Sequence, residues 1–417
     1  MTMPQDWSAC RLNDAAEITM GQSPDSKYYS DEEIGLPFLQ GCAEFQARFP
    51  LPKLYCSNSK KIAKRGAILF SVRAPVGRQN IAERDYVIGR GLAAIQGKQV
   101  AQPYLEHFLT WEAPKFSAAS QGSTFEAINS SELASWPVIY PTDCAEQSKI
   151  AEVLSTVDMA IAQTEALIAK QQRIKTGLMQ DLLTRGIDEA GQLRSEATHA
   201  FKDSPLGRIP VEWDLARLGD VADVNRGKFT HRPRDDARFY GGSHPFIQTG
   251  DVAANVGRIV DDFSQTLSTM GTRVSNEFPK GTIAITIAAN IADTAILGRP
   301  MYFPDSVVGA VAKAPNSIRF IEMTVRRHKP ALEQLAPKSA QSNINLETLR
   351  PLVIALPKPA EQERIATAYE AVDERQISNE QSLRKLHHLK TALMQDLLTG
   401  KVRVTPLLQY AKEAASA

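Results

Sequence analysis

The sequence predicts an α+β protein in which two mixed α/β domains are each followed by a long helix, as an internal repeat. The heptapeptide LMQDLLT occurs at residues 178–184 and again at residues 393–399. Shifting the chain by 215 positions extends this match without a gap over residues 146–184 and 361–399, with 17 identities in 39 positions. Such a match indicates that the chain contains a duplicated unit.

The repeated segments have the periodicity of long helices. Apolar residues recur with a 4,3 spacing, and seven of ten stripe positions are apolar in each copy. The stripe positions are Ile150, Leu154, Val157, Ile161, Thr164, Ile168, Gln171, Lys175, Leu178 and Leu182 in the first copy, and Ile365, Tyr369, Val372, Gln376, Asn379, Leu383, Leu386, Lys390, Leu393 and Leu397 in the second. Matching stripes favour a coiled coil between the two helices, and separate packing of each helix on its own domain is the alternative.

The length of these helices and their two lysines bear on their role. A helix of 39 residues is about 58 Å long, which suits a spacer between domains. Lys175 and Lys390 interrupt both stripes at one equivalent place. We expect their charged ends to reach solvent along the helix surface, and a contact that fixes the register or binds a partner is the alternative.

The segments before the helices read as mixed α/β domains. Short β-branched runs such as AILFSV and TIAITIAA alternate with glycine and proline, and PYLEHFLTW is typical of a helix. Residues around Trp7 and Trp213 resemble each other, as do LPFLQG and HPFIQTG. The predicted parts are a domain over 1–145, a long helix over 146–187, a linker over 188–210, a domain over 211–358, a long helix over 359–402 and a tail over 403–417.

Composition excludes several classes of protein. With 417 residues, of which 43% are hydrophobic and 23% charged, the chain fits two or three globular domains. No apolar run is long enough to span a membrane, and the start lacks a basic region followed by an apolar one, so we expect a cytoplasmic protein without a membrane partner. The four cysteines are widely spaced, which predicts neither disulfides nor a zinc site.

The sequence carries no recognisable catalytic motif. It contains no DPPY or NPPY tetrapeptide for methyl transfer to adenine, no phosphate-binding loop, no HExxH and no dinucleotide-binding turn. We therefore expect no catalytic residue, no bound metal and no cofactor in this chain.

Charge is concentrated locally although the net charge is only +1. Between Arg48 and Arg90 there are ten Lys or Arg residues against two acids. A weaker basic run in the second repeat contains Arg226, Lys228, Arg232 and Arg234. Such runs are typical of surfaces that contact nucleic-acid phosphates, and a solvated face is the alternative.

Two loops in each repeat carry side chains that suit base reading. Arginine pairs with guanine in the major groove, and Asn or Gln pairs with adenine. The candidates in the first repeat are Arg73, Arg78, Gln79, Asn80, Arg90, Gln121 and Thr124. Those in the second repeat are Asn290, Gln341 and Asn343, together with the basic residues Arg226, Lys228, Arg232 and Arg234.

Several segments resemble the specificity subunit of Type I restriction-modification enzymes. They are PTDCAEQSKIAEVLSTVD, RIKTGLMQDLLT, KDSPLGRIPVEW and LKTALMQDLLTGKVRV, and the resemblance covers nearly the whole chain. It implies two target recognition domains that each read one half of a split DNA sequence, held apart by an antiparallel pair of helices that sets the spacer. One residue departs from the family pattern, since Ala292 stands where related domains often carry glycine.

The resemblance also implies partners. Double-stranded DNA, two methyltransferase subunits and two restriction or motor subunits are expected, with S-adenosylmethionine on the methyltransferase and ATP and Mg on the motor. The alternative function is a coiled-coil scaffold that recruits partners without reading DNA.

Both long helices end with more apolar surface than one stripe can bury, which predicts two equivalent partner-binding surfaces. The candidates are Leu178, Leu182, Leu183, Leu393, Leu397 and Leu398. Packing of these leucines on the adjacent domain is the alternative.

Overall fold

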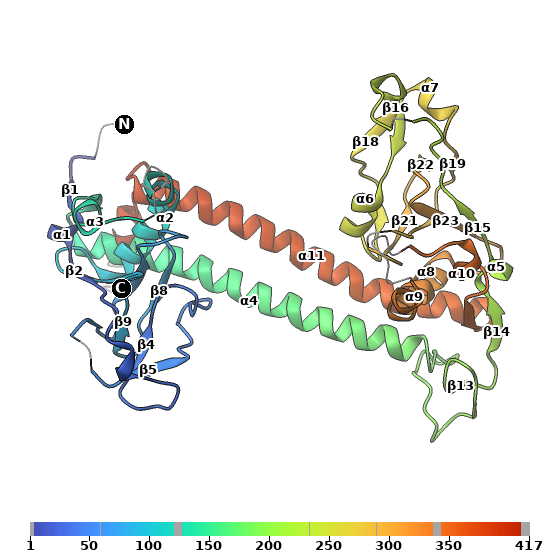
Figure 1. Ribbon diagram of the computed structural model, residues 1–417, viewed down its shortest axis with the longest axis horizontal. Helices are drawn as coiled ribbons and strands as arrows, with labels where there is room; N and C mark the ends of the chain where they lie inside the picture. The colour runs from blue at the N-terminus through green and yellow to red at the C-terminus, as the bar shows by residue number, and fades with distance from the viewer. Residues whose placement is uncertain are drawn as a thin grey trace. The chain divides into compact units, whose positions relative to one another are not determined.

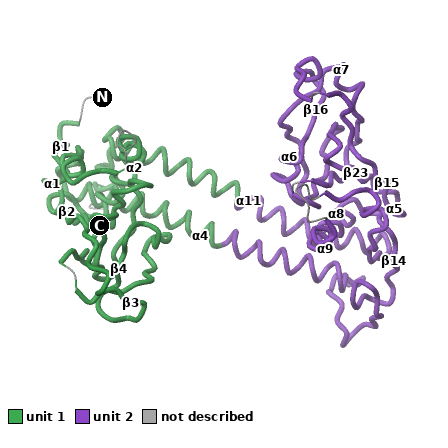
Figure 2. Tube along the Cα trace, in the orientation of Figure 1, with its two compact units in different colours: residues 1–166, 380–417 green, residues 167–379 purple. Residues whose placement is uncertain are grey.

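The chain forms two compact units that each draw on both repeats. The structure is a computed structural model and describes residues 4–58, 60–120, 127–232, 234–288, 290–336 and 343–409. One unit takes residues 1–166 and 380–417, and the other takes residues 167–379 (Figure 2). The two longest helices of the described chain are α4 (Cys144–Leu182) and α11 (Pro359–Leu398) (Figure 1). Each of them contributes a part to both units (Figure 2). The predicted fold class is confirmed.

The first unit contains a domain of three sheets and three shorter helices. The two-stranded sheet pairs β1 (Trp7–Arg11) with β11 (Pro137–Pro141). The central sheet has the order β2 (Ala16–Met20), β10 (Leu92–Gly97), β7 (Ile68–Ser71), β8 (Gln79–Ile81), and the outer sheet β3 (Tyr29–Ser30), β5 (Leu54–Cys56), β4 (Leu36–Leu39), β9 (Tyr86–Ile88), β6 (Ile62–Ala63). The helices are α1 (Leu12–Ala15), α2 (Gln102–Ser120) and α3 (Ser130–Ala134), with a 3₁₀ turn η1 (Ser26–Tyr28).

The second unit repeats this plan. A two-stranded sheet pairs β14 (Asp214–Arg217) with β24 (Val353–Leu356), and β12 (Phe201–Lys202) pairs with β13 (Ile209–Pro210). The central sheet has the order β15 (Ala222–Arg226), β23 (Val307–Ala312), β20 (Ile283–Thr286), β21 (Thr294–Leu297), β17 (Ile259–Val260). The outer sheet is β18 (Gln265–Leu267), β16 (Tyr240–Phe246), β22 (Met301–Tyr302), β19 (Glu277–Phe278). The helices are α5 (Leu218–Val221), α6 (Thr249–Ala254), α7 (Thr269–Thr272), α8 (Ile318–Arg327), α9 (Lys329–Leu335) and α10 (Leu346–Leu349), with a 3₁₀ turn η2 (Ala237–Phe239).

The central sheet of each domain separates two apolar cores. In β7, Ile68 and Phe70 belong to the core that includes α2, whereas Leu69 points into the core beside the outer sheet. In β20, Ile283 and Ile285 share one core and Ala284 lies in the other. Successive side chains of a strand face opposite sides, so a strand buried on both faces reads as a continuous apolar run. That explains AILFSV and TIAITIAA.

The two long helices pack antiparallel within the second unit. Lys175 forms an ion pair with Asp373, and both side chains are only 8% exposed. One turn away, Gln376 Nε2 donates to Gln172 Oε1 at 2.9 Å. The two residue numbers of each pair have the same sum, as an antiparallel register requires. The Lys175 ammonium also lies 5.2 Å from the centre of the Tyr369 ring.

The first unit contains the equivalent pair. Lys390 Nζ lies 2.6 Å from Asp158 Oδ1, with 25% and 34% of the two side chains exposed. Lys390 and Asp158 are the repeat equivalents of Lys175 and Asp373. The expectation that both lysines only reach solvent is therefore wrong, and the alternative of a register contact holds. A single sequence position could not show this, because the partner of each lysine lies in the other repeat.

The start of each long helix is tied to the segment that follows the other helix. Glu146 is 1% exposed and accepts two hydrogen bonds from Arg403, both at 2.6 Å. Glu361 is 5% exposed and is held in the same way by Arg194, which also contacts Glu212 at 3.1 Å. Arginine and carboxylate form their strongest contacts in this two-bond geometry. Each unit is thus closed by residues from both repeats, and the linker that contains Arg194 is part of the fold.

The two equivalent lysine pairs differ in burial, and we predict that they differ in stabilisation. Asp373→Ala leaves the buried Lys175 without its ion-pair partner and should lower the free energy of unfolding by about 3–5 kcal/mol. Asp158→Ala removes a more exposed pair and should cost about 1 kcal/mol. Chemical denaturation of both variants checks this. Equal losses would show that burial does not set the contribution of these pairs.

Candidate nucleic-acid interface

The first predicted loop forms a closed turn between β7 and β8. The main chain of Ser71 accepts from Gly77 N at 3.0 Å, and its N–H donates to the Arg78 carbonyl at 2.8 Å. The Ser71 hydroxyl, which is 1% exposed, donates to the Arg73 carbonyl at 2.7 Å. Gly77 has a φ of 89°, which glycine adopts readily. A buried hydroxyl and one glycine therefore fix the backbone of the loop that carries Arg73 and Arg78.

The described end of the second predicted loop, at Ala127 and Ile128, lies beside the first. Arg73 and Ala127 form an antiparallel bridge, and Ile128 N donates to the Val72 carbonyl at 2.9 Å. The structure thus brings together two segments that are about 50 residues apart in the sequence. Gln121 and Thr124, which were predicted in this second loop, lie outside the described residues.

The second repeat builds the same constellation. Ala292 N donates to the Thr286 carbonyl at 2.8 Å, and Thr286 N donates to the Asp293 carbonyl at 3.0 Å. Ala288 bridges to Asn343, and Ile344 N donates to the Ile287 carbonyl at 3.1 Å. Ala292 has a φ of 61°, the one positive φ of a non-glycine residue in the described ranges. The alanine found here in place of glycine therefore keeps the turn. Gln341 lies outside the described residues.

The candidates of the first repeat differ in accessibility. Arg73, Arg78 and Arg90 are exposed. By contrast, Asn80 is 3% exposed, and its amide bonds to the main chain of Gln46 and Gln79. Gln79 is half-buried, and both polar atoms of its amide are inaccessible. Asn80 therefore supports the loop from within, Gln79 keeps its amide out of solvent, and the arginines are the side chains that the loop presents.

Three arginines of the basic run in the second repeat lie around Asp305. Arg234 forms an ion pair with Asp305, Arg232 Nη2 lies 3.5 Å from the same carboxylate, and Arg226 Nε donates to the Asp305 carbonyl at 2.5 Å. Lys228 is exposed nearby in the sequence. An adjacent cavity of about 460 Å³ is lined by Phe229, Arg234, Asp235, Tyr240, Phe246, Gln248, Gln265 and Pro304. The three arginines keep an excess of positive charge over Asp305 at this edge of the domain.

The six candidate partner-binding leucines lie in or against the cores. Leu182, Leu183, Leu397 and Leu398 are at most 3% exposed. Leu182 and Leu183 share a core with Trp213 and Ile365, with Leu178 packed against it. Leu397 and Leu398 share a core with Trp7 and Ile150, with Leu393 packed against it. Their burial favours the alternative that they pack on the adjacent domain.

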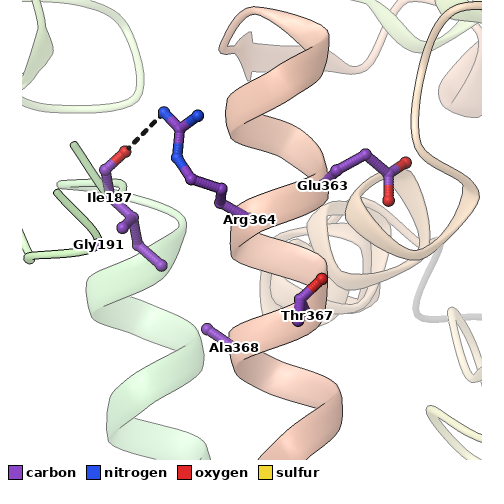
Figure 3. Close-up of a pocket in the computed structure, with 6 residues that line it drawn as sticks. All are labelled: Ile187, Gly191, Glu363, Arg364, Thr367 and Ala368. Atoms are coloured by element: carbon purple, nitrogen blue, oxygen red, sulfur yellow. Dashed lines mark hydrogen bonds between the residues drawn. The ribbon is translucent and has the colours of Figure 1, made fainter. Parts of the chain in front are cut away.

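A groove of about 380 Å³ opens in the second unit where α11 begins (Figure 3). Its lining residues are Ile187, Gly191, Glu363, Arg364, Thr367 and Ala368. Arg364 reaches from α11 toward the turn after α4, where Nη2 donates to the Ile187 carbonyl at 3.3 Å (Figure 3). The equivalents of Thr367 and Ala368 in α4 are Glu152 and Val153. The first repeat carries different residues at these positions, so the groove is no candidate for a partner site that occurs twice.

Within the described ranges, no cluster of His, Cys, Asp or Glu side chains could hold a metal ion. No helix in this part of the chain has the length and hydropathy of a membrane span. The four cysteines are free thiols.

The two domains share one arrangement of adjacent loops, and each is followed by one of the two paired long helices. The chain belongs to the family described as Type I restriction modification DNA specificity domain, whose model matches residues 4–172 and 210–388. The resemblance noted in the sequence motifs is thereby confirmed.

The chain is also similar in sequence and in fold to proteins named as specificity subunits of type I systems. The MjaIX type I restriction enzyme specificity subunit of Methanocaldococcus jannaschii is 23% identical over 97% of this chain and 95% of its own. The MjaX specificity subunit of the same organism is 37% identical, over 44% of each chain. The S subunit of a Type I restriction-modification system from M. genitalium has the same fold, with a TM-score of 0.62 at 13% identity over 95% of this chain and 98% of that one. A chain from a structure described as the structural basis of complex assembly and conformational transition of the type I R-M system also has this fold. Its TM-score is 0.60 at 16% identity, over 96% of this chain and 100% of that one.

The sequence did not identify the residues whose side chains hold the loop backbones, Ser71 and Thr286. Ser71 and Thr286 are buried polar residues at strand ends, and nothing in their neighbourhood marks them. Their equivalence at the offset of 215 was the available signal, because both repeats keep a hydroxyl at this position.

The turn itself yields a prediction. Gly77→Ala should destabilise the protein by about 1–2 kcal/mol, because alanine is strained at this φ and its Cβ would lie 3.2 Å from the Ala113 backbone. Ala292→Gly, the reciprocal control, relieves strain but removes a buried methyl group, so the free energy of unfolding should change by less than about 1 kcal/mol. Thermal unfolding measures both. A stable Gly77→Ala variant would show that the turn tolerates side chains.

Proposed function

We propose that this chain is the non-catalytic DNA-reading subunit of a type I restriction-modification complex, and that each domain reads one half of a bipartite target. The observation that carries the proposal is the pair of adjacent loops, which occurs once in each repeat with the same main-chain contacts and different exposed side chains. A common frame with variable side chains is what two readers of different sequences require. The names of the relatives, type I restriction enzyme specificity subunits, support the same function.

DNA contacts in this proposal divide into two kinds. Phosphate contacts position a protein on DNA, and base contacts specify the sequence. The exposed Lys228 and the arginines around Asp305 suit phosphates, and the two loop turns suit base edges. Because the chain lacks catalytic motifs, methyl transfer with S-adenosylmethionine belongs to a partner methyltransferase subunit. ATP and Mg belong to restriction or motor subunits, of which we expect two.

We propose that two methyltransferase subunits dock on two equivalent exposed surfaces of the long helices. Ile174 in α4 and Leu389 in α11 are repeat equivalents, and they are 50% and 48% exposed. Each is flanked on the same helix face by an exposed lysine four residues earlier and an exposed small residue three later, namely Lys170 and Gly177, or Lys385 and Ala392. Two like surfaces with apolar centres fit two copies of one partner. This replaces the buried leucines as the proposed contact.

The docking prediction separates binding from folding. Ile174→Asp or Leu389→Asp alone should leave one methyltransferase bound per chain, and the double variant should leave none, because a carboxylate cannot enter an apolar contact. Both should keep the wild-type melting temperature. Met159→Asp is the control, since Met159 is 58% exposed and its repeat equivalent is Glu374. Native mass spectrometry counts the bound subunits. Two bound subunits on the double variant would reject these surfaces.

We also propose that the paired helices set the spacer between the half-sites. Four helical residues inserted after Ala166, with four after the equivalent Gln381, keep both lysine–aspartate pairs in register and add about 6 Å of helix. At about 3.4 Å per base pair, the spacer should lengthen by about two base pairs with unchanged half-sites. Insertion into α4 alone is the control, and it should abolish activity because it breaks the register.

The readout of the insertion experiment is the methylated motif in DNA treated with the chain and its methyltransferase. Altered half-sites with the old spacing would reject the spacer role. Methylation without any sequence preference by the wild-type complex would favour a scaffold that recruits partners without reading DNA.

A further inference from the structure

The two repeats present different chemistry from the same turn. At the common offset of 215, Arg73 corresponds to Ala288 and Arg78 to Asp293. Arg73 and Arg78 are both exposed, and among the described residues neither side chain forms an ion pair. Asp293 is 6% exposed and is neutralised by Lys329, whose Nζ lies 2.5 Å from Oδ1. The first turn therefore offers two guanidinium groups, and the second offers none.

The second turn presents amides instead. Asn290 occupies the position of Pro75 and is exposed. Asn343, also exposed, forms the bridge with Ala288 that joins the two loops. The buried Thr286 hydroxyl donates to the Asn290 carbonyl, four residues later, whereas the equivalent Ser71 donates to the Arg73 carbonyl, two residues later. The two equivalent hydroxyls thus hold different positions of the turn, namely Arg73 in the first repeat and Asn290 in the second.

These two sets of side chains fit different bases. A guanidinium donates two hydrogen bonds to O6 and N7 of guanine, whereas an Asn amide accepts from N6 and donates to N7 of adenine. A fixed backbone favours such two-bond contacts, because it restricts where the side chain can reach.

We propose that the half-site read by the first domain contains a guanine contacted by Arg73 or Arg78, and that the half-site read by the second domain contains an adenine contacted by Asn290 or Asn343. The inference rests on the proposed function. It adds which base each turn selects.

The test uses the complete chain assembled with its methyltransferase and maps the methylated motif. Arg73→Gln and Arg78→Gln are made separately, and at least one should relax selection at a single G·C pair of one half-site, reducing discrimination there by about ten- to a hundred-fold. Asn290→Ser and Asn343→Ser should relax an A·T pair in the other half-site. Arg65→Gln, an exposed arginine outside the turn, is the matched control and should leave the motif unchanged.

The outcomes separate this inference from the proposed function. A wild-type complex without sequence preference would reject both. A bipartite wild-type motif that none of the four variants relaxes at the expected base pair would reject only the base assignment. Uniform loss of binding to all sequences, with a weaker dependence on salt, would identify Arg73 and Arg78 as phosphate contacts and overturn their assignment to guanine.

Discussion

The structure depends on contacts between the start of each long helix and the segment that follows the other long helix. Glu146 and Glu361, at the starts of the long helices, are almost fully buried, and each receives two hydrogen bonds from an arginine that follows the other helix. A buried carboxylate without such a partner is strongly unfavourable. The start of each long helix is therefore stabilised by the segment that follows the other long helix. The leucines that end each helix complete the same two cores.

The two domains share one frame but differ in the side chains exposed on their adjacent loops. The central sheets, the buried hydroxyls of Ser71 and Thr286, and the bridges between adjacent loops are shared by both domains. The exposed side chains on those loops differ, with arginines in one repeat and asparagines in the other. The residues that hold the loop backbones are thus different from the residues whose side chains are exposed on the loops.

The sequence predicted what periodicity and duplication can reveal. Matching apolar stripes indicated paired helices, and short apolar runs indicated strands buried on both faces. It did not predict that Lys175 meets Asp373, because that contact depends on the antiparallel register. It also could not distinguish Asn80, which is buried and bonded to the main chain of Gln46, from the exposed arginines beside it. Residue type suggests what a side chain can bind, whereas burial decides whether it is presented.

The claim that each domain reads its own half-site is tested most directly by exchanging residues 1–145 for the equivalent domain of a relative and sequencing the methylated DNA. The exchanged domain must keep apolar residues at Trp7 and Leu12, because these share a core with Leu397 and Leu398 at the end of α11. We predict a new sequence in one half of the motif, with the other half and the spacer unchanged. A motif altered in both halves, or in neither, would contradict the division of reading between the two domains.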